Sequence, residues 1–195
     1  MDDPKNMAKA GARKTSWLKR ILLTLAILAG LLIVVVAMQP SEFLVTRTAT
    51  MAAPVSAVFP HVNELKQWEA WSPWAKMDPE MKTSYEGPSA GPGAVSSWSG
   101  NHEVGKGRMT IQESRTNELI RFHLEFFEPM AGTSSAEFQF KPDGNGTTVT
   151  WSMSGKNNFI GKAMCLVMNM DKMVGGQFDQ GLASMKYIVE SGPKP

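Results

Sequence analysis

An unbroken apolar run near the N-terminus constrains this chain more than any other feature. Ile21 to Met38 are eighteen consecutive residues without a charge. A helix of that length, at a rise of ~1.5 Å per residue, extends ~27 Å and approaches the ~30 Å hydrocarbon core of a bilayer. The run therefore predicts a transmembrane helix over residues 21–38, and it leaves the polar remainder of the chain to form a folded domain.

Basic residues are concentrated on one side of this run. The first twenty residues carry six Lys or Arg and two Asp, whereas Arg47 is the only basic residue among the fifteen that follow Met38. Positively charged flanks of membrane helices stay in the cytoplasm. We therefore expect residues 1–20 to form a basic cytoplasmic tail, and the main domain of this single-pass membrane protein to be extracytoplasmic.

A cleaved signal peptide is the alternative interpretation of the same segment. Val35-Val36-Ala37 resembles a small-x-small cleavage site only weakly, and eighteen apolar residues exceed the ~7–15 of a usual signal-peptide core. An uncleaved anchor is preferred for these reasons, although the sequence leaves cleavage open. Gly30 stands alone in the run, which therefore has no GxxxG motif for helix pairing and is interpreted as a tether.

The basic tail accounts for the net charge of the chain. The whole sequence carries 20 Lys or Arg and 18 Asp or Glu, but 14 basic and 16 acidic residues remain after Pro40. This mildly acidic remainder has no basic excess for a phosphate backbone, so nucleic acid is not expected as a partner. Its length suits one domain with a sizeable core, and the single Cys165 excludes an intrachain disulfide.

Alternating apolar and polar residues predict seven strands in this remainder. The first covers residues 43–51, and turn residues separate the other six, at about 81–86, 94–99, 106–115, 119–128, 133–141 and 147–154. Turns this short join antiparallel neighbours, so we expect these six strands to form an antiparallel meander within a seven-stranded antiparallel sheet.

Helices are predicted between the first two strands and at the C-terminus. Pro54 opens a short helix, Asn63 is placed as the cap of a second, and Pro73 ends that second helix. Residues 159–189 contain no proline and repeat apolar residues at helical spacing, which predicts one long helix with a kink or a close contact at Gly175-Gly176. The fold class is therefore α+β, with a curved sheet around the last helix.

Several segments of the sequence resemble a known family. They are Trp68-Glu69-Ala70-Trp71-Ser72-Pro73-Trp74, Trp98-Ser99-Gly100-Asn101, Val104 to Ile111, and Asp171 to Phe178. Together with the order of elements they resemble the polyketide cyclase/dehydrase-like group of the START-like (SRPBCC) superfamily, over about residues 42–190. The resemblance implies a helix-grip fold with a deep, mostly apolar cavity between the sheet and the last helix. Residues 191–195 are left as a flexible C-terminus.

The same resemblance implies a range of functions. Members of the superfamily bind lipids, sterols, polyketides or other hydrophobic molecules, and a minority catalyse cyclisation or dehydration. Our first hypothesis is a membrane-tethered domain that binds a hydrophobic small molecule or lipid in an internal cavity, without a cofactor. We expect nine residues to bind the ligand, and those on strands are assigned by alternation. They are Trp71, Trp98, Met109, Phe122, Phe138, Trp151, Met164, Met168 and Phe178.

Two alternatives stay open at this point. A cyclase/dehydratase-type enzyme would need polar groups in the cavity, and the candidates are His123, Glu125 and Arg121, which share one face of a predicted strand. Such a row is more often a solvated face of a sheet. A non-catalytic interaction protein of the cell envelope is the other alternative, for which an exposed aromatic patch around Trp74 would be the sign.

Three further patterns resemble reactive or metal sites. Gly87-Pro88-Ser89-Ala90-Gly91 matches the nucleophile elbow of hydrolases, but Pro92-Gly93 follows where that motif needs a helix. His102-Glu103 begins like a zinc-protease motif, yet Lys106 occupies the position of its second histidine, and His61, His102 and His123 lack ligand spacing.

A methionine cluster in the C-terminal region is the last of these patterns. Met164, Met168, Met170 and Met173 are conceivable thioether ligands for copper(I), but methionine more often lines an apolar cavity. We therefore expect no metal site in this chain.

Overall fold

The computed structural model describes residues 4–167 and 169–192. These residues divide into two compact units, which are described separately below. The first unit comprises the N-terminal segment up to Pro40 together with Asn158–Val167, and the second comprises Ser41–Asn157 together with the C-terminal helix.

The first unit is built on helix α1, Pro4–Ala37. From Trp17 to Ala37 this helix is long and apolar enough to cross a membrane, a property that an N-terminal signal sequence shares. The helix begins well before the predicted apolar run, so the basic residues up to Arg20 continue the same helix. The second element of the unit is the short helix α5, Phe159–Met164, whose first turn is capped by Asn158.

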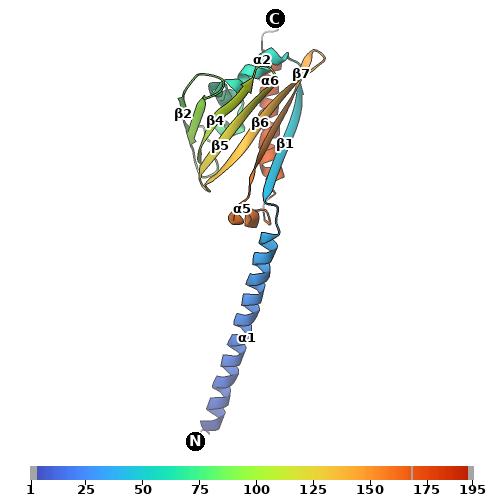
Figure 1. The fold of residues 1–195 in the computed structure, drawn as a ribbon. Helices are drawn as coiled ribbons and strands as arrows, with labels where there is room; N and C mark the ends of the chain where they lie inside the picture. Colours follow the sequence, from blue (N-terminus) through green and yellow to red (C-terminus); the bar gives the residue numbers. More distant parts are fainter. Residues whose placement is uncertain (1–3, 168, 193–195) are drawn as a thin grey trace. The chain divides into compact units, whose positions relative to one another are not determined.

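The second unit contains a single seven-stranded sheet (Figure 1). Its strands lie in the order β1-β7-β6-β5-β4-β3-β2, and every neighbouring pair is antiparallel. The strands are β1 Glu42–Met51, β2 Lys82–Glu86, β3 Val95–Ser99, β4 Lys106–Arg115, β5 Leu119–Glu128, β6 Gly132–Asp143 and β7 Gly146–Lys156. The predicted antiparallel meander is confirmed, with the first strand completing the sheet beside the last.

Short helices between β1 and β2 and a long helix at the C-terminus complete this unit. They are α2 Val55–Asn63, the 3₁₀ helix η1 Leu65–Gln67, α3 Trp68–Trp71, α4 Pro73–Met77 and α6 Met170–Ser191. Figure 1 shows α6 running along one face of the sheet. This arrangement confirms the predicted helix-grip fold, in which the sheet and α6 bury their apolar faces against each other.

One detail of the predicted helices was wrong, and a second was confirmed but incomplete. Asn63 does not cap a helix: it ends α2, and its side-chain oxygen accepts a hydrogen bond from the Ser114 hydroxyl at 2.7 Å. Pro73 follows the end of α3 as predicted, but it also begins α4, because a proline in the first turn gives up no helical hydrogen bond.

The predicted C-terminal helix is also two helices rather than one. The chain leaves helical geometry after α5, and α6 begins behind Asn169, whose side chain accepts a hydrogen bond from the Lys172 amide at 3.0 Å. Asn158 and Asn169 thus each supply a local N-cap. Gly175-Gly176 lies inside α6 without ending it. The last residues of the predicted flexible C-terminus, 193–195, lie outside the described residues.

An arginine on β1 explains why a glycine is needed at Gly175. The Arg47 guanidinium binds Asp171 at 2.9 Å and Asp179 at 3.1 Å, both on α6, and a Cβ on Gly175 would collide with it. The hydrogen bond from Arg47 holds the pKa of Asp171 below its ordinary value. The predicted close contact is therefore made at Gly175, whereas a Cβ on Gly176 would meet nothing within 4 Å.

The two adjacent glycines should respond oppositely to alanine. Gly176→Ala should raise the free energy of unfolding by ~0.5–1 kcal/mol, because alanine costs less conformational entropy than glycine inside a helix. Gly175→Ala should lower it, because the new methyl group displaces Arg47 from Asp171. Thermal unfolding of both variants in the same detergent tests this difference, and equal stabilisation by the two substitutions would refute the proposed contact.

Candidate ligand-binding cavity

The second unit contains a cavity of about 230 Å³ between the sheet and its helices, and this cavity is partly open to solvent. Side chains of strands β2 to β7 form one wall, and η1, α3, α4 and α6 form the other. Most of the lining is apolar, with Trp, Phe, Met, Leu and Val side chains in the majority. A cavity of this composition binds an apolar molecule by removing its surface from water.

The Trp68–Trp74 segment places two indole rings in the cavity wall. Trp68 and Trp74 line the cavity, whereas Trp71 is fully buried and packs against Trp68 with ring centroids 4.5 Å apart. The indole N–H of Trp68 donates to the Val62 carbonyl at 3.0 Å, and that of Trp71 donates to the His61 carbonyl at 2.9 Å. Both rings are thereby held in fixed positions against the end of α2.

Trp98 owes its position to a glycine on the neighbouring strand. Gly107 of β4 pairs with Trp98 of β3, and a Cβ on Gly107 would collide with the indole ring. The ring also packs edge-on against Phe126, with centroids 6.0 Å apart, and both side chains line the cavity. This contact joins the Trp98-Ser99-Gly100-Asn101 and Lys106-Gly107 segments across β3 and β4.

The structure brings four of the nine predicted ligand-binding residues to the cavity wall. They are Trp98, Met109, Trp151 and Phe178. Three others are fully buried in the surrounding core and do not line it: Trp71, Phe122 and Phe138. Met164 lies in α5 of the first unit and is not part of the lining, and Met168 lies outside the described residues.

Several other lining residues were not predicted from the sequence, although their spacing from predicted residues places them on the same faces of the strands and of α6. Leu124 and Phe126 line the cavity two and four residues after Phe122, on the same face of β5. Similarly, Met153 follows Trp151 by two residues on β7, and Val174 precedes Phe178 by one turn of α6. On β5 the residue predicted by alternation, Phe122, therefore shares the face that lines the cavity but precedes the lining residues along the strand.

A polar pair lies where the cavity reaches the surface. The Tyr85 hydroxyl donates to the Glu69 carboxylate at 2.7 Å, and both residues line the cavity although Glu69 is exposed to solvent. Burial raises the pKa of the Tyr85 hydroxyl, and the hydrogen bond to Glu69 raises it further. Ser72 and Ser96, both buried, add hydroxyl groups to the lining. A ligand with an apolar body and one polar group matches this arrangement.

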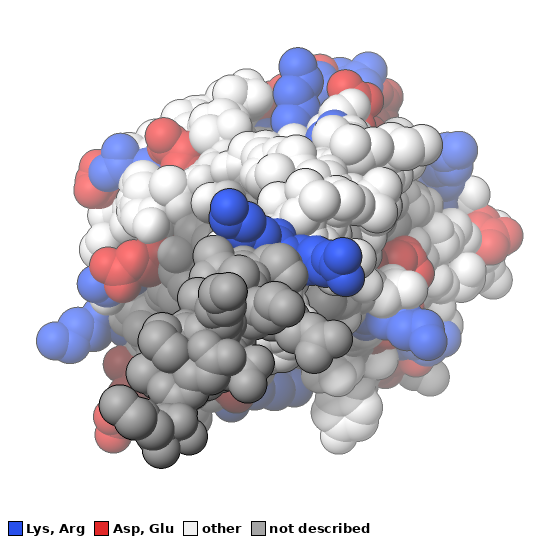
Figure 2. All heavy atoms as spheres, turned by 90° about the horizontal axis from the view of Figure 1, so that it is seen from below, with Lys and Arg blue, Asp and Glu red and all other residues white. Residues whose placement is uncertain are grey.

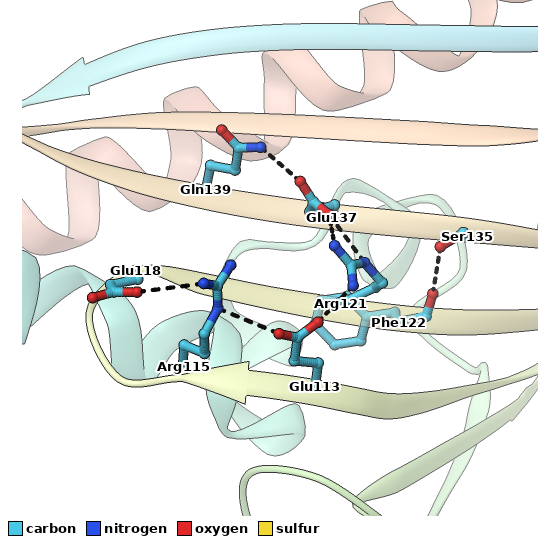
Figure 3. Close-up of polar contacts among 8 residues, drawn as sticks. All are labelled: Glu113, Arg115, Glu118, Arg121, Phe122, Ser135, Glu137 and Gln139. Atoms are coloured by element: carbon cyan, nitrogen blue, oxygen red, sulfur yellow. Dashed lines mark hydrogen bonds and ion pairs between the residues drawn. The ribbon is translucent and has the colours of Figure 1, made fainter.

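The predicted acid–base row lies on the other face of the sheet. Arg121 is held between Glu113 and Glu137 in a chain of ion pairs that reaches across β4, β5 and β6, with 2.7 Å between Arg121 Nη2 and Glu137 Oε2 (Figure 3). His123 and Glu125 alternate along β5 with the cavity residues Leu124 and Phe126, so they share the face of Arg121. None of the three candidates lines the cavity.

Arg121 and its carboxylate partners have the electrostatics of an ion-pair network. Burial raises the pKa of Glu137, but hydrogen bonds from Gln139 and Arg121 outweigh it and hold the pKa below its ordinary value. The Arg121 guanidinium forms ion pairs with both Glu113 and Glu137. In Figure 2, which views the molecule from below, acidic and basic side chains are similarly interspersed around the edge of the visible face.

The remaining sequence patterns have ordinary structural explanations. The Gly87–Gly93 segment is a loop before β3, and Ser89 within it is exposed. A nucleophile elbow requires a helix directly after the serine, whereas a strand follows this loop. Trp74 packs edge-on against Trp151 and Phe178 rather than in an exposed patch. Within residues 4–167 and 169–192, no group of three His, Cys, Asp or Glu side chains is arranged to hold a metal ion.

Comparison with known proteins identifies the family of this chain. The model of the family described as polyketide cyclase / dehydrase and lipid transport matches residues 42–190. The chain belongs to this family. The resemblance seen in the tryptophan- and glycine-containing segments is thereby confirmed, and hydrophobic-ligand binding is the property that the family implies. The family description covers both enzymes and transport, so it does not by itself assign a reaction to this chain.

Solved structures show the same fold at low sequence identity. Protein CV1439 from Chromobacterium violaceum is 15% identical with a TM-score of 0.55, over 77% of this chain and 98% of that one. Aha1 from Colwellia psychrerythraea, solved as a dimer, is 13% identical with a TM-score of 0.56, over 78% and 99%. Protein Ms6760 from Mycobacterium smegmatis is 19% identical with a TM-score of 0.53, over 75% and 90%. A comparison with curated proteins gave no match.

The Tyr85–Glu69 pair can be tested by titration. In a Tyr187→Phe background Tyr85 is the remaining tyrosine, and its phenolate absorbance should appear only above the ordinary pKa of ~10. Adding Glu69→Gln should lower the pKa of Tyr85 only in part, because burial remains. The raised pKa also means that the free energy of unfolding falls above pH ~10, since the unfolded chain releases this proton more readily. Identical titrations with and without Glu69 would contradict the pairing.

Proposed function

We propose that this protein is a membrane-tethered binding module that holds a hydrophobic small molecule, or the apolar part of a lipid, in its internal cavity. The observation that carries the proposal is the apolar cavity of about 230 Å³ between the sheet and α6. Membership of a family described by lipid transport supports it. Burial of apolar ligand surface, worth ~25 cal/mol per Å², would supply most of the affinity.

The size of the cavity narrows the class of ligand. An apolar protein cavity of ~150 Å³ holds a molecule the size of benzene, and sites for drug-sized ligands run from ~300 Å³ upward. A cavity of about 230 Å³ therefore suits a compact hydrophobic molecule or a segment of one acyl chain. The exposed Glu69 and its partner Tyr85 would face the polar end of such a ligand.

The tether is proposed from helix α1. Its apolar side chains from Leu22 to Val35 are largely exposed, with Leu28 at 56%, as expected for a surface that contacts lipid. Lys19 and Arg20 immediately precede the apolar run, which favours a cytoplasmic N-terminus and an extracytoplasmic main domain. The cavity would then be within reach of the lipid leaflet from which a hydrophobic ligand can be taken.

Retention of the anchor can be measured directly. The protein should remain in the membrane fraction after alkaline carbonate extraction, and its intact mass should correspond to the full 21.4 kDa chain. The basic flank and the length of the apolar run are the physical reasons for this expectation. A soluble product that has lost the residues up to about Ala37 would instead identify a signal peptide and exclude the tether.

Ligand binding can be tested by filling the cavity. Val174→Phe places a larger side chain in the lining from α6, and it should weaken binding of the compact fluorophore N-phenyl-1-naphthylamine by about tenfold or more. Val189→Phe is the matched control, because Val189 is also half-buried on α6 but does not line the cavity. Melting temperatures of both variants establish that they fold.

Equal affinities of the two variants for the fluorophore would argue against the cavity as the binding site. Native mass spectrometry of the purified full chain is the complementary measurement. It should reveal a copurifying molecule of one acyl chain or smaller, consistent with the cavity volume. The Val174→Phe variant should lose this molecule, and the Val189→Phe variant should keep it.

A further inference from the structure

Large apolar side chains are exposed on and just after helix α5. Phe159 is 54% exposed, Ile160 59%, Leu166 40% and Val167 83%. These four lie within residues 158–167, which we call the α5 segment. Apolar side chains gathered so closely on a surface mark a site of interaction.

The first unit places this segment against the end of helix α1. Val36 is only 4% exposed, although its neighbours Val34 and Val35 are 54% and 45% exposed, and α5 contacts α1. The Lys162 ammonium donates a hydrogen bond to the Ala37 carbonyl at 3.2 Å, which satisfies a carbonyl in the last turn of α1. The apolar surface of the α5 segment is therefore continuous with the apolar surface of α1.

The backbone of the α5 segment is well satisfied internally. Asn158 accepts a hydrogen bond from the Gly161 amide through its side chain at 2.8 Å and from the Lys162 amide through its carbonyl at 2.9 Å. Further along, the amides of Cys165, Leu166 and Val167 donate to carbonyls within the segment. Paired backbone groups are a condition for entering the low-dielectric edge of a bilayer.

We propose that the α5 segment is a second membrane contact, which lies in the interfacial layer of the bilayer beside the end of α1. Phe159, Ile160, Leu166 and Val167 insert among the outermost parts of the acyl chains, and Lys162 keeps its charge at the level of the headgroups. This inference rests on the proposed tether, because continuity with α1 is what identifies lipid as the occupant of the surface.

The position of the segment along the chain gives this contact a functional consequence. It connects β7, which contributes Trp151 and Met153 to the cavity, with α6, which contributes Val174 and Phe178. An α5 segment fixed in lipid would restrain the chain between two elements of the cavity wall. A single flexible tether at Pro40 would impose no such restraint.

Depth-dependent quenching of a bound fluorophore tests the contact in the full chain. Single cysteines replace Phe159, Val167, Leu28 or Asn145 in a Cys165→Ser background, and each is labelled with bimane in vesicles of phosphatidylcholine and phosphatidylglycerol. Leu28 is the control near the middle of the apolar part of α1, and Asn145 is the control in the exposed β6–β7 turn.

The expected pattern separates the two controls from the α5 segment. Lipids spin-labelled near the headgroup should quench the labels at 159 and 167 at least twofold more than the label at 145, whereas lipids spin-labelled deep in the acyl chain should quench the label at 28. Labels at 159 and 167 that behave like the label at 145, with the label at 28 still quenched, would overturn the contact and leave the tether intact. An unquenched label at 28 would refute the tether and the contact together.

Discussion

The stacking of Trp151 on Phe178 is the interaction on which the fold and the cavity depend. Their ring centroids are 3.9 Å apart, the rings are inclined by only 10°, and they join β7, the neighbour of the edge strand β1, to α6. The two layers can approach this closely because Gly181, one turn later on α6, has no side chain: a Cβ there would lie 3.0 Å from the Trp151 ring. Trp68 and Trp71 complete the cluster by packing edge-on against Trp151.

This aromatic cluster also explains why a cavity exists beside it. Rigid indole rings with their N–H groups bonded to backbone carbonyls, as in Trp68 and Trp71, cannot move to fill neighbouring space. Trp98 is held differently, by close packing of its ring over Gly107 on the next strand. The sheet and α6 are thus joined at one place by aromatic rings, and beyond the rings they separate enough to leave room for a ligand. Polar groups are confined to a few positions of the lining, so the cavity selects first for apolar surface.

Much of the fold follows from local properties of the sequence. Alternation and turn residues predicted the number and order of the strands, because side-chain direction in a strand repeats every two residues whatever its neighbours. The segments containing Trp68 and Trp98 identified the family. The break between α5 and α6 was not predicted, because no proline lies there. In the structure, the Asn169 side chain caps the first turn of α6 and shows that a new helix begins.

Residues close together in the chain dictate the apolar segment of α1, the antiparallel meander of β2 to β7 and the apolar face of each strand. The tertiary structure decided which part of that face becomes cavity. On β5 the apolar residues Phe122 and Leu124 point the same way, but Phe122 is buried in the aromatic core and Leu124 lines the cavity. The difference arises from the helices that cover each position, and these come from distant parts of the chain. The same dependence placed Arg121 between Glu113 and Glu137 on the opposite face, in an ion-pair network outside the cavity.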